Sequence, residues 1–130
     1  MVKYINVKSK SRTEFIDITE MVQEAVKEAK VMKGICYLYV PHTTAGITIN
    51  EGADPSVQRD ILNSLSRLIP HEMNYSHREG NADAHIKTTL VGSSVNVFIE
   101  EGKLLLGTWQ SIFFCDFDGP RHRRIAIKFL

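Results

Sequence analysis

Three histidines in this sequence stand beside polar loop residues, where imidazole could bind a metal or transfer protons near neutral pH. His77 and His85 lie eight residues apart within the stretch NYSHREGNADAHIKTTL, and His42 opens the short connection HTTAG. A spacing of eight matches no standard zinc motif, and a lone histidine is more often an ordinary polar side chain than a ligand. Because Asn81 and Asp83 lie in the same cluster, a site for zinc or a similar divalent ion becomes as good an interpretation as a plain loop.

Two carboxylates follow the apolar segment GITIN. Asp54 directly precedes Pro55, and this pair is typical of a helix N-cap followed by the first helical position. Glu51 has no such structural explanation. It is therefore a candidate general base or metal ligand, although a solvated side chain is an equally ordinary interpretation.

The segment CDFDGPRHRR combines alternating aspartates with arginines. Asp-Gly-Pro is typical of a turn, so a hairpin turn is the simplest interpretation. In an extended segment, however, Asp116 and Asp118 would project to the same face, and Arg121 or Arg123 would offer a guanidinium fork to a phosphate. In HTTAG, the hydroxyls of Thr43 and Thr44 and exposed backbone N–H groups could also meet an anion.

The only tryptophan, Trp109, lies in the motif GTWQ. A tryptophan is more often a core or interface residue than a platform for a ligand. The alternative is that the indole stacks on an aromatic substrate while the Gln110 amide contacts the edge of that substrate.

Hydrophobic periodicity predicts the elements that must position these residues. Residues 3–9 and 13–19 alternate as strands and are expected to pair as a hairpin. Amphipathic helices are predicted within 17–34 and 54–70, and strands are predicted at 34–43 and 46–52. The remainder, from residue 85 to 130, is expected to be strand and turn, with EEGK as a hairpin turn. The predicted fold class is α+β: a β-rich sandwich of about seven or eight mainly antiparallel strands with two helices.

Length and composition limit the interpretation further. The chain has 130 residues and a mass of 14.7 kDa, which predicts a single domain over residues 1–130. A formal net charge of +1 gives no reason to expect a nucleic-acid partner, and no apolar stretch is long enough to predict a membrane span. Cys36 and Cys115 are expected to be buried thiols, which favours a cytoplasmic protein.

The string SVNVFIEEGKLLLGTWQSI, residues 94–112, resembles the YjbQ family in the spacing of Ser94, Val97, Ile99, Gly102 and GTWQ. The blocks HTTAGITINEGADPSVQRDIL, NYSHREGNADAHIKTTLVG and DFDGPR resemble the same family, so the likeness covers nearly the whole chain. The resemblance implies a β-rich homotrimer whose clefts are shared with a neighbouring subunit. It also implies a weak thiamine-phosphate synthase activity, in which hydroxymethylpyrimidine diphosphate is coupled to a thiazole phosphate.

The resemblance implies that His42, Glu51, Asn81 and His85 belong to a shared polar cleft, and it assigns no individual roles. The roles expected here, for a cleft that takes a small phosphorylated substrate, are a hypothesis about the chemistry. The expected metal ligands, for zinc or magnesium, are His77, His85 and Asp116. The expected catalytic residues are His42, Glu51 and Asn81. The expected substrate-binding residues are Thr43, Thr44, Trp109, Gln110, Arg121 and Arg123.

Two other functions fit the same residues. A cluster of histidines and carboxylates at the rim of a sheet could activate water in a metal-dependent hydrolase of a small phosphate or ester. The protein could also be a non-enzymatic trimer that binds a metal or a metabolite.

Overall fold

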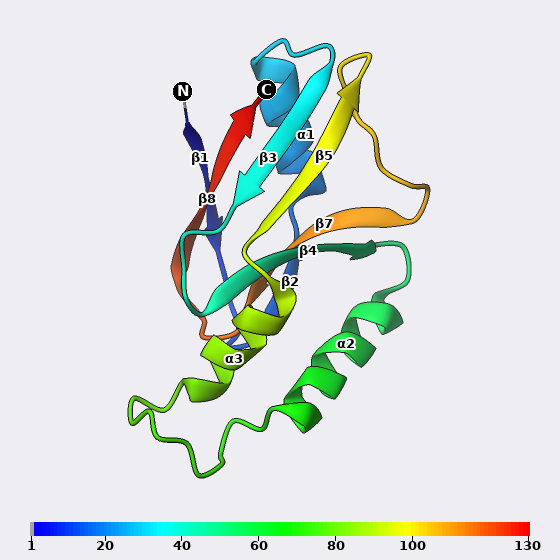
Figure 1. The fold of residues 1–130 in the computed structure, drawn as a ribbon. Coiled ribbons are helices and arrows are strands. Elements are labelled where there is room, and N and C mark those ends of the chain that lie inside the picture. The colour runs from blue at the N-terminus through cyan, green and yellow to red at the C-terminus, as the bar shows by residue number, and fades with distance from the viewer. Residues whose placement is uncertain (1) are drawn as a thin grey trace.

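The computed structural model describes residues 2–130 as two antiparallel sheets and three helices (Figure 1). The larger sheet has the order β1-β8-β3-β5-β6, and the smaller has the order β2-β7-β4. In chain order the elements are β1 Lys3–Lys8, β2 Glu14–Asp17, α1 Thr19–Glu28, β3 Gly34–Tyr39, β4 Ala45–Glu51, α2 Pro55–Leu68, α3 Ala82–Val91, β5 Ser94–Glu100, β6 Lys103–Leu104, β7 Gln110–Asp116 and β8 His122–Phe129. The predicted α+β class and strand number are confirmed.

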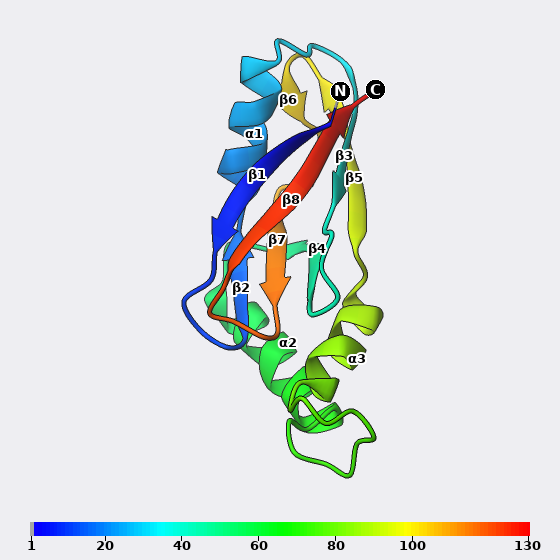
Figure 2. The ribbon, with the colours of Figure 1, turned by 90° about the vertical axis from the view of Figure 1, so that its left-hand side faces the viewer.

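The main core lies between the sheets, because alternate side chains of each strand face inward. Cys36 and Leu38 of β3 meet Ile112 and Phe114 of β7, and α1 adds Val22 to the same cluster. The outer face of the larger sheet is left uncovered by any helix (Figure 2).

The strand β7 is buried on both faces, which explains its uninterrupted apolar run. Phe113 and Cys115 point away from the main core and form a second cluster with Ala84 of α3. Leu62 and Leu65 of α2 pack against this cluster. The helices α2 and α3 therefore cover the far side of the smaller sheet.

Three predictions about local structure were wrong. Residues 85–92 were predicted as a strand, but they belong mostly to α3, so the chain has three helices rather than two. The segments 3–9 and 13–19 do not form a hairpin, because β1 pairs with β8 and β2 pairs with β7. The Asp-Gly-Pro turn does not close a hairpin either, because β7 and β8 lie in different sheets.

Other predictions are confirmed. Asp54 caps α2 by accepting a hydrogen bond from the Ser56 N–H at 2.9 Å. The EEGK segment joins the paired strands β5 and β6. Cys36 and Cys115 are both buried free thiols, and burial raises the pKa of Cys36 to about 12. Among residues 2–130, no helix combines the length and the apolarity needed to cross a bilayer.

Candidate functional site

A polar pocket of about 400 Å³ lies between the connection from β3 to β4 and the helix α3. The connection contributes His42 and Thr43, and the helix contributes His85 and Thr88. Two segments about 40 residues apart in the chain thus meet, as the sequence analysis expected for His42 and His85. The backbone of β4 approaches α3 closely, because the Ile47 N–H donates to the Gly92 carbonyl at 3.1 Å.

The hydrogen bonding of His42 fixes its chemistry. The backbone N–H of Arg124 donates to Nε2 of His42 at 3.1 Å, so Nε2 must be unprotonated. Burial lowers the pKa of His42, and the positive charge of Arg123 lowers it further. The ring is therefore neutral near pH 7 and carries its single proton on Nδ1, which makes His42 a hydrogen-bond donor through Nδ1.

A buried ion pair between Asp116 and Arg123 holds the connection between β3 and β4 in place. Nε and Nη2 of Arg123 donate to the two carboxylate oxygens at 3.0 and 2.8 Å, and Ser9 Oγ donates to the same carboxylate at 2.6 Å. Arg123 Nη2 also donates to Thr44 Oγ1 at 2.9 Å. The side chain of Thr44 thus ties its loop to Arg123, while Thr43 lines the pocket.

The carboxylate of Asp116 is fully engaged, since the Asp118 N–H also donates to it at 2.9 Å. Burial on its own would raise the pKa of Asp116, but the hydrogen bonds from Arg123 and Ser9 outweigh burial and hold the pKa below its ordinary value. Metal coordination by Asp116 would require the carboxylate to give up these donors.

Asp118 joins Asn81 to this network. Asn81 Nδ2 donates to Asp118 Oδ2 at 2.9 Å, and Arg121 Nη2 donates to the same oxygen at 3.0 Å. About half of the Arg121 side chain is exposed, so part of its guanidinium can still meet an anion. Asn81 and Arg121, both expected at one site, both contact the carboxylate of Asp118.

A second buried charge cluster joins Asp83, which was grouped with the histidines as a candidate metal site, to Arg12 and Lys87, which were assigned no role. Asp83, which has no exposed surface, accepts two hydrogen bonds from Arg12 at 3.1 and 3.0 Å and one from Lys87 at 3.0 Å. Burial would raise the pKa of Asp83, but these donors lower it overall. The spacing of Asp83 and Lys87, i and i+4, would have indicated the pair if the segment had been interpreted as a helix.

The two clusters leave the site with positive charge. Arg12, Lys87 and Arg123 are three cations, and Asp83 and Asp116 are the two carboxylates that they contact. Asp118, whose side chain is 15% exposed, pairs with Arg121, whose side chain is 54% exposed. With this pair included, four cations face three carboxylates, and the one surplus positive charge is most accessible to an anion at Arg121.

His77 and His85 lie together, as expected for a metal site. Their ring centroids are 5.2 Å apart in an edge-to-face arrangement. The nearest carboxylate to His77 is that of Glu79, at 3.9 Å and largely exposed. Within residues 2–130, no group of three or more histidine, cysteine or acidic side chains could hold a metal ion. The described residues therefore offer two imidazoles but no complete ligand set for zinc.

Glu51, Trp109 and Gln110 lie away from this pocket within one chain. Ala45 pairs with Asp116 at one end of β4, and Glu51 pairs with Gln110 at the other end. A strand of this length spans about 20 Å at a rise of about 3.3 Å per residue. Trp109 is exposed, and Gln110 Oε1 accepts a hydrogen bond from the Gly107 N–H at 2.8 Å. These three residues could share a cleft with His42 only if a neighbouring subunit brought them there.

The chain matches a family model described as UPF0047 protein YjbQ-like over residues 3–130. It is 56% identical over 130 residues to UPF0047 protein MJ1081 of Methanocaldococcus jannaschii, covering all of this chain and 94% of that protein. It is 48% identical over 132 residues to UPF0047 protein YugU of Bacillus subtilis, covering all of this chain and 99% of that protein.

Solved structures support the same relationship. A crystal structure of an uncharacterised YjbQ/UPF0047 protein from Clostridium acetobutylicum matches with a TM-score of 0.96 at 51% identity, over 98% of this chain and 99% of that chain. The conserved hypothetical protein TT1486 of Thermus thermophilus matches with a TM-score of 0.92 at 40% identity, over 98% of this chain and 99% of that chain. The names of these relatives state no activity.

Proposed function

Because the chain belongs to the UPF0047 family of YjbQ-like proteins, we propose that it is a transferase with a weak or secondary thiamine-phosphate synthase activity. The substrates would be hydroxymethylpyrimidine diphosphate and a thiazole phosphate. The thiazole nitrogen attacks the methylene carbon, the bond between that carbon and the diphosphate oxygen breaks, and diphosphate leaves with the bonding electrons.

The observation that carries this proposal is a pocket lined by hydrogen-bond donors, beside a charge network in which the half-exposed Arg121 is the most accessible cation. The reaction needs no protein nucleophile, and its main demand is stabilisation of the charge that develops on the leaving diphosphate. Nδ1–H of His42 and the hydroxyl of Thr43 could donate to its oxygens, and Arg121 could add a charged contact. Asn81 and Arg123 would hold Asp118 and the loop of Thr44 in position.

The proposal includes a divalent ion, zinc or magnesium, with His77 and His85 as two of its ligands. Such an ion would supply charge neutralisation for the diphosphate. Since the described residues offer only two imidazoles, further ligands would come from the substrate or from a neighbouring subunit, and no step is assigned to the metal.

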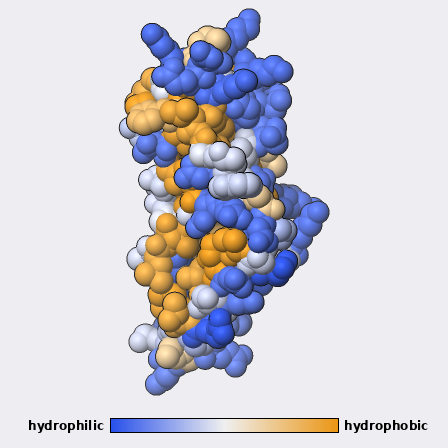
Figure 3. Space-filling view, turned by 90° about the vertical axis from the view of Figure 1, so that its right-hand side faces the viewer, coloured by the Kyte–Doolittle hydropathy of each residue, from blue (hydrophilic) through white to orange (hydrophobic). Residues whose placement is uncertain are grey.

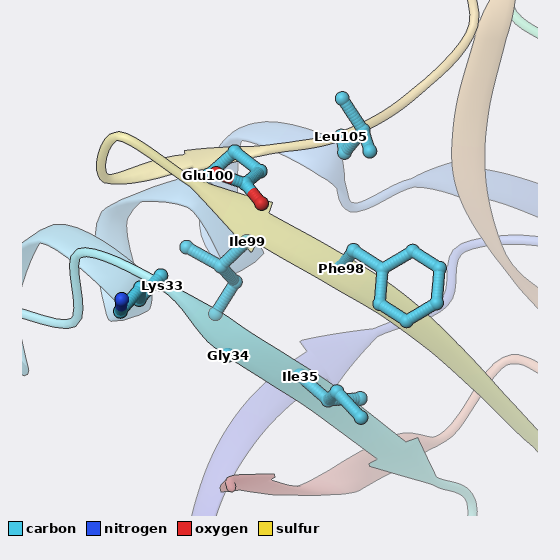
Figure 4. Close-up of a pocket in the computed structure, with 7 residues that line it drawn as sticks. All are labelled: Lys33, Gly34, Ile35, Phe98, Ile99, Glu100 and Leu105. Carbon is cyan, nitrogen blue, oxygen red and sulfur yellow. The ribbon is translucent and has the colours of Figure 1, made fainter.

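A homotrimer is also part of the proposal, and the uncovered face of the larger sheet supports it. Tyr37, Tyr39 and Phe98 are between 42% and 58% exposed on this face, although such large apolar side chains are usually buried. Ile35, Phe98 and Leu105 line a depression of about 630 Å³ there (Figure 4). Apolar surface is also spread over the side of the molecule shown in Figure 3. A second copy is the proposed occupant, because it could also bring Glu51, Trp109 and Gln110 to the pocket.

The test is turnover by the purified protein with both precursors and magnesium or zinc. We expect thiamine phosphate to form. We expect His42→Ala and His85→Ala each to lose at least about tenfold in rate, since the first removes a donor to the developing charge and the second removes a proposed metal ligand. Because Trp109 lies away from the pocket within one chain, Trp109→Ala should lower turnover only if a neighbouring subunit brings Trp109 into the cleft. Glu28→Gln, on the exposed end of α1, is the control and should leave turnover unchanged.

Three outcomes would redirect the proposal. Unchanged rates in both histidine variants would remove these residues from the mechanism. Release of inorganic phosphate from a single ester, lost on chelation, would favour the hydrolase. Bound zinc without turnover in either assay would favour the non-enzymatic binding protein.

A further inference from the structure

Thr88 on α3 holds a buried hydroxyl that has no hydrogen-bond partner among the described residues. The residue is 7% exposed and lines the pocket with His42 and His85. Its Oγ1 is one of two buried side-chain atoms, with Asn81 Oδ1, that lack a partner within residues 2–130. Leaving such a group unpaired costs about 1–3 kcal/mol, so the hydroxyl is expected to meet a ligand.

The neighbouring Thr89 shows what a helical threonine ordinarily does. Thr89 Oγ1 donates to the carbonyl of His85, four residues earlier, at 2.9 Å. This local bond is the usual way for a threonine to satisfy its hydroxyl inside a helix. The hydroxyl of Thr88 does not make the equivalent bond, so it keeps both its hydrogen and its lone pairs available.

The residues that line the pocket around Thr88 include several hydrogen-bond donors and no carboxylate. Nδ1–H of His42 is a donor because Nε2 accepts from Arg124. Thr43 adds a hydroxyl, and Arg123, which donates to the adjacent Thr44, places a positive charge near His42. A ligand that fits these groups has several acceptor oxygens and a negative charge.

We propose that Thr88 Oγ1 and Nδ1–H of His42 together bind one phosphate group of the substrate, so that Thr88 is a substrate-binding residue. The assignment rests on the anionic substrate of the proposed function and deepens it by locating a phosphate subsite. The volume of about 400 Å³ lies within the range of small-molecule sites, which leaves space for the organic part of the substrate beside the phosphate.

The experiment is calorimetric titration of the full chain with inorganic phosphate and with diphosphate. Thr88→Val keeps the shape of the side chain and removes the hydroxyl, and we expect it to weaken binding by about tenfold, the usual effect of a hydrogen bond to a charged group. Thr88→Ser keeps the hydroxyl and should bind within about threefold of the parent. Thr48→Val on β4 removes a hydroxyl that does not line the pocket and should leave binding unchanged.

Thermal unfolding separates ligand binding from a structural role. Without phosphate, Thr88→Val should be at least as stable as the parent, because it removes an unpaired buried hydroxyl. With phosphate, the parent should gain more stability than Thr88→Val, since a ligand that binds the folded state stabilises it more when the dissociation constant is smaller.

Some results would overturn the inference. Equal phosphate affinity in the parent and in Thr88→Val would do so, and so would equal weakening in Thr88→Val and Thr88→Ser. Absence of phosphate and diphosphate binding by the parent would also exclude the subsite. Binding that depends on Thr88 without any thiamine phosphate formation would keep the subsite and reject the transferase.

Discussion

The Asp116–Arg123 pair shows why residue type alone does not reveal whether a side chain binds a ligand or supports the fold. Alternating aspartates followed by arginines suggested a metal ligand and a phosphate fork. In the folded chain the two side chains satisfy each other, with four donors on one carboxylate. Their contribution is to fix the loop that presents His42 and Thr43, because Arg123 also holds Thr44.

Replacing Asp116 by alanine should strongly destabilise the protein. The change leaves the Arg123 guanidinium buried without its counter-charge, which costs about 3–5 kcal/mol in comparable buried pairs. Urea unfolding monitored by circular dichroism measures the loss. Asp60→Ala, on the exposed side of α2, is the control and should change stability by less than about 0.5 kcal/mol. Equal stability of the two variants would contradict the structural role of the pair.

Acidification should destabilise the protein through Asp83 and Asp116. The pKa of each carboxyl is lowered in the folded protein, whereas an unfolded aspartate titrates near ~3.9. The stability that these groups add is complete above about pH 5, about one unit above the unfolded pKa, and is lost as the pH falls through their folded pKa values. Urea unfolding between about pH 2.5 and 7 should show this decline.

Asp83→Asn tests the origin of the acid sensitivity. The variant should be less stable than the parent near neutral pH, because Lys87 and Arg12 lose their shared carboxylate. It should also lose less stability below about pH 4, since one titrating group is gone. Parallel curves for parent and variant would show that Asp83 is not a source of the pH dependence.

At the scale of elements, the docking of α3 on β4 assembles the pocket. Residues 85–92 are rich in β-branched side chains and were predicted as a strand. They form a helix because Ala84, Lys87 and Thr88 then fall on one buried face, with the charge of Lys87 met by Asp83. Tertiary contacts thus override a local preference that is worth at most about 1 kcal/mol.

Gly46→Ala should disturb this docking. A Cβ at Gly46 would lie 2.5 Å from the carbonyl oxygen of Gly92 and 3.2 Å from Val91 Cγ1, so α3 would have to move. We expect a loss of about 1–3 kcal/mol in the free energy of unfolding. Gly107→Ala is the control, because its Cβ would meet only the flexible end of Gln110. Chemical denaturation that found both variants equally stable would argue against a tight fit.

For the whole molecule, the main unexplained feature is the bare outer face of the larger sheet. A protein of this size rarely leaves several aromatic side chains exposed on one sheet without covering them. The distribution of the predicted site residues points the same way, since β4 separates Glu51 and Gln110 from the pocket at its other end. A closed symmetric assembly would cover the outer face of the larger sheet. It would also bring Glu51 and Gln110 of one subunit close to the pocket of another.

Phe98→Asp should disrupt the proposed trimer. Light scattering of the parent is expected to give three times the chain mass, and the charge on the sheet face should shift the variant toward the monomer because an unpaired carboxylate would be buried. Leu68→Asp, at an exposed leucine at the end of α2, is the control for added charge. A monomeric parent would reject the trimer, and full turnover by a dissociated variant would reject the shared cleft.

The sequence by itself determined the strands, the two helices with clear apolar stripes and the cap at Asp54, because these depend on local periodicity and turn chemistry. It also brought His42, His77 and His85 forward as neighbours of one site. Only the tertiary structure decided that residues 85–92 are mostly helical and that Asp116 forms an ion pair with Arg123. It alone showed that the Thr88 hydroxyl has no hydrogen-bond partner among residues 2–130. These features depend on contacts between segments far apart in the chain, and local patterns do not contain that information.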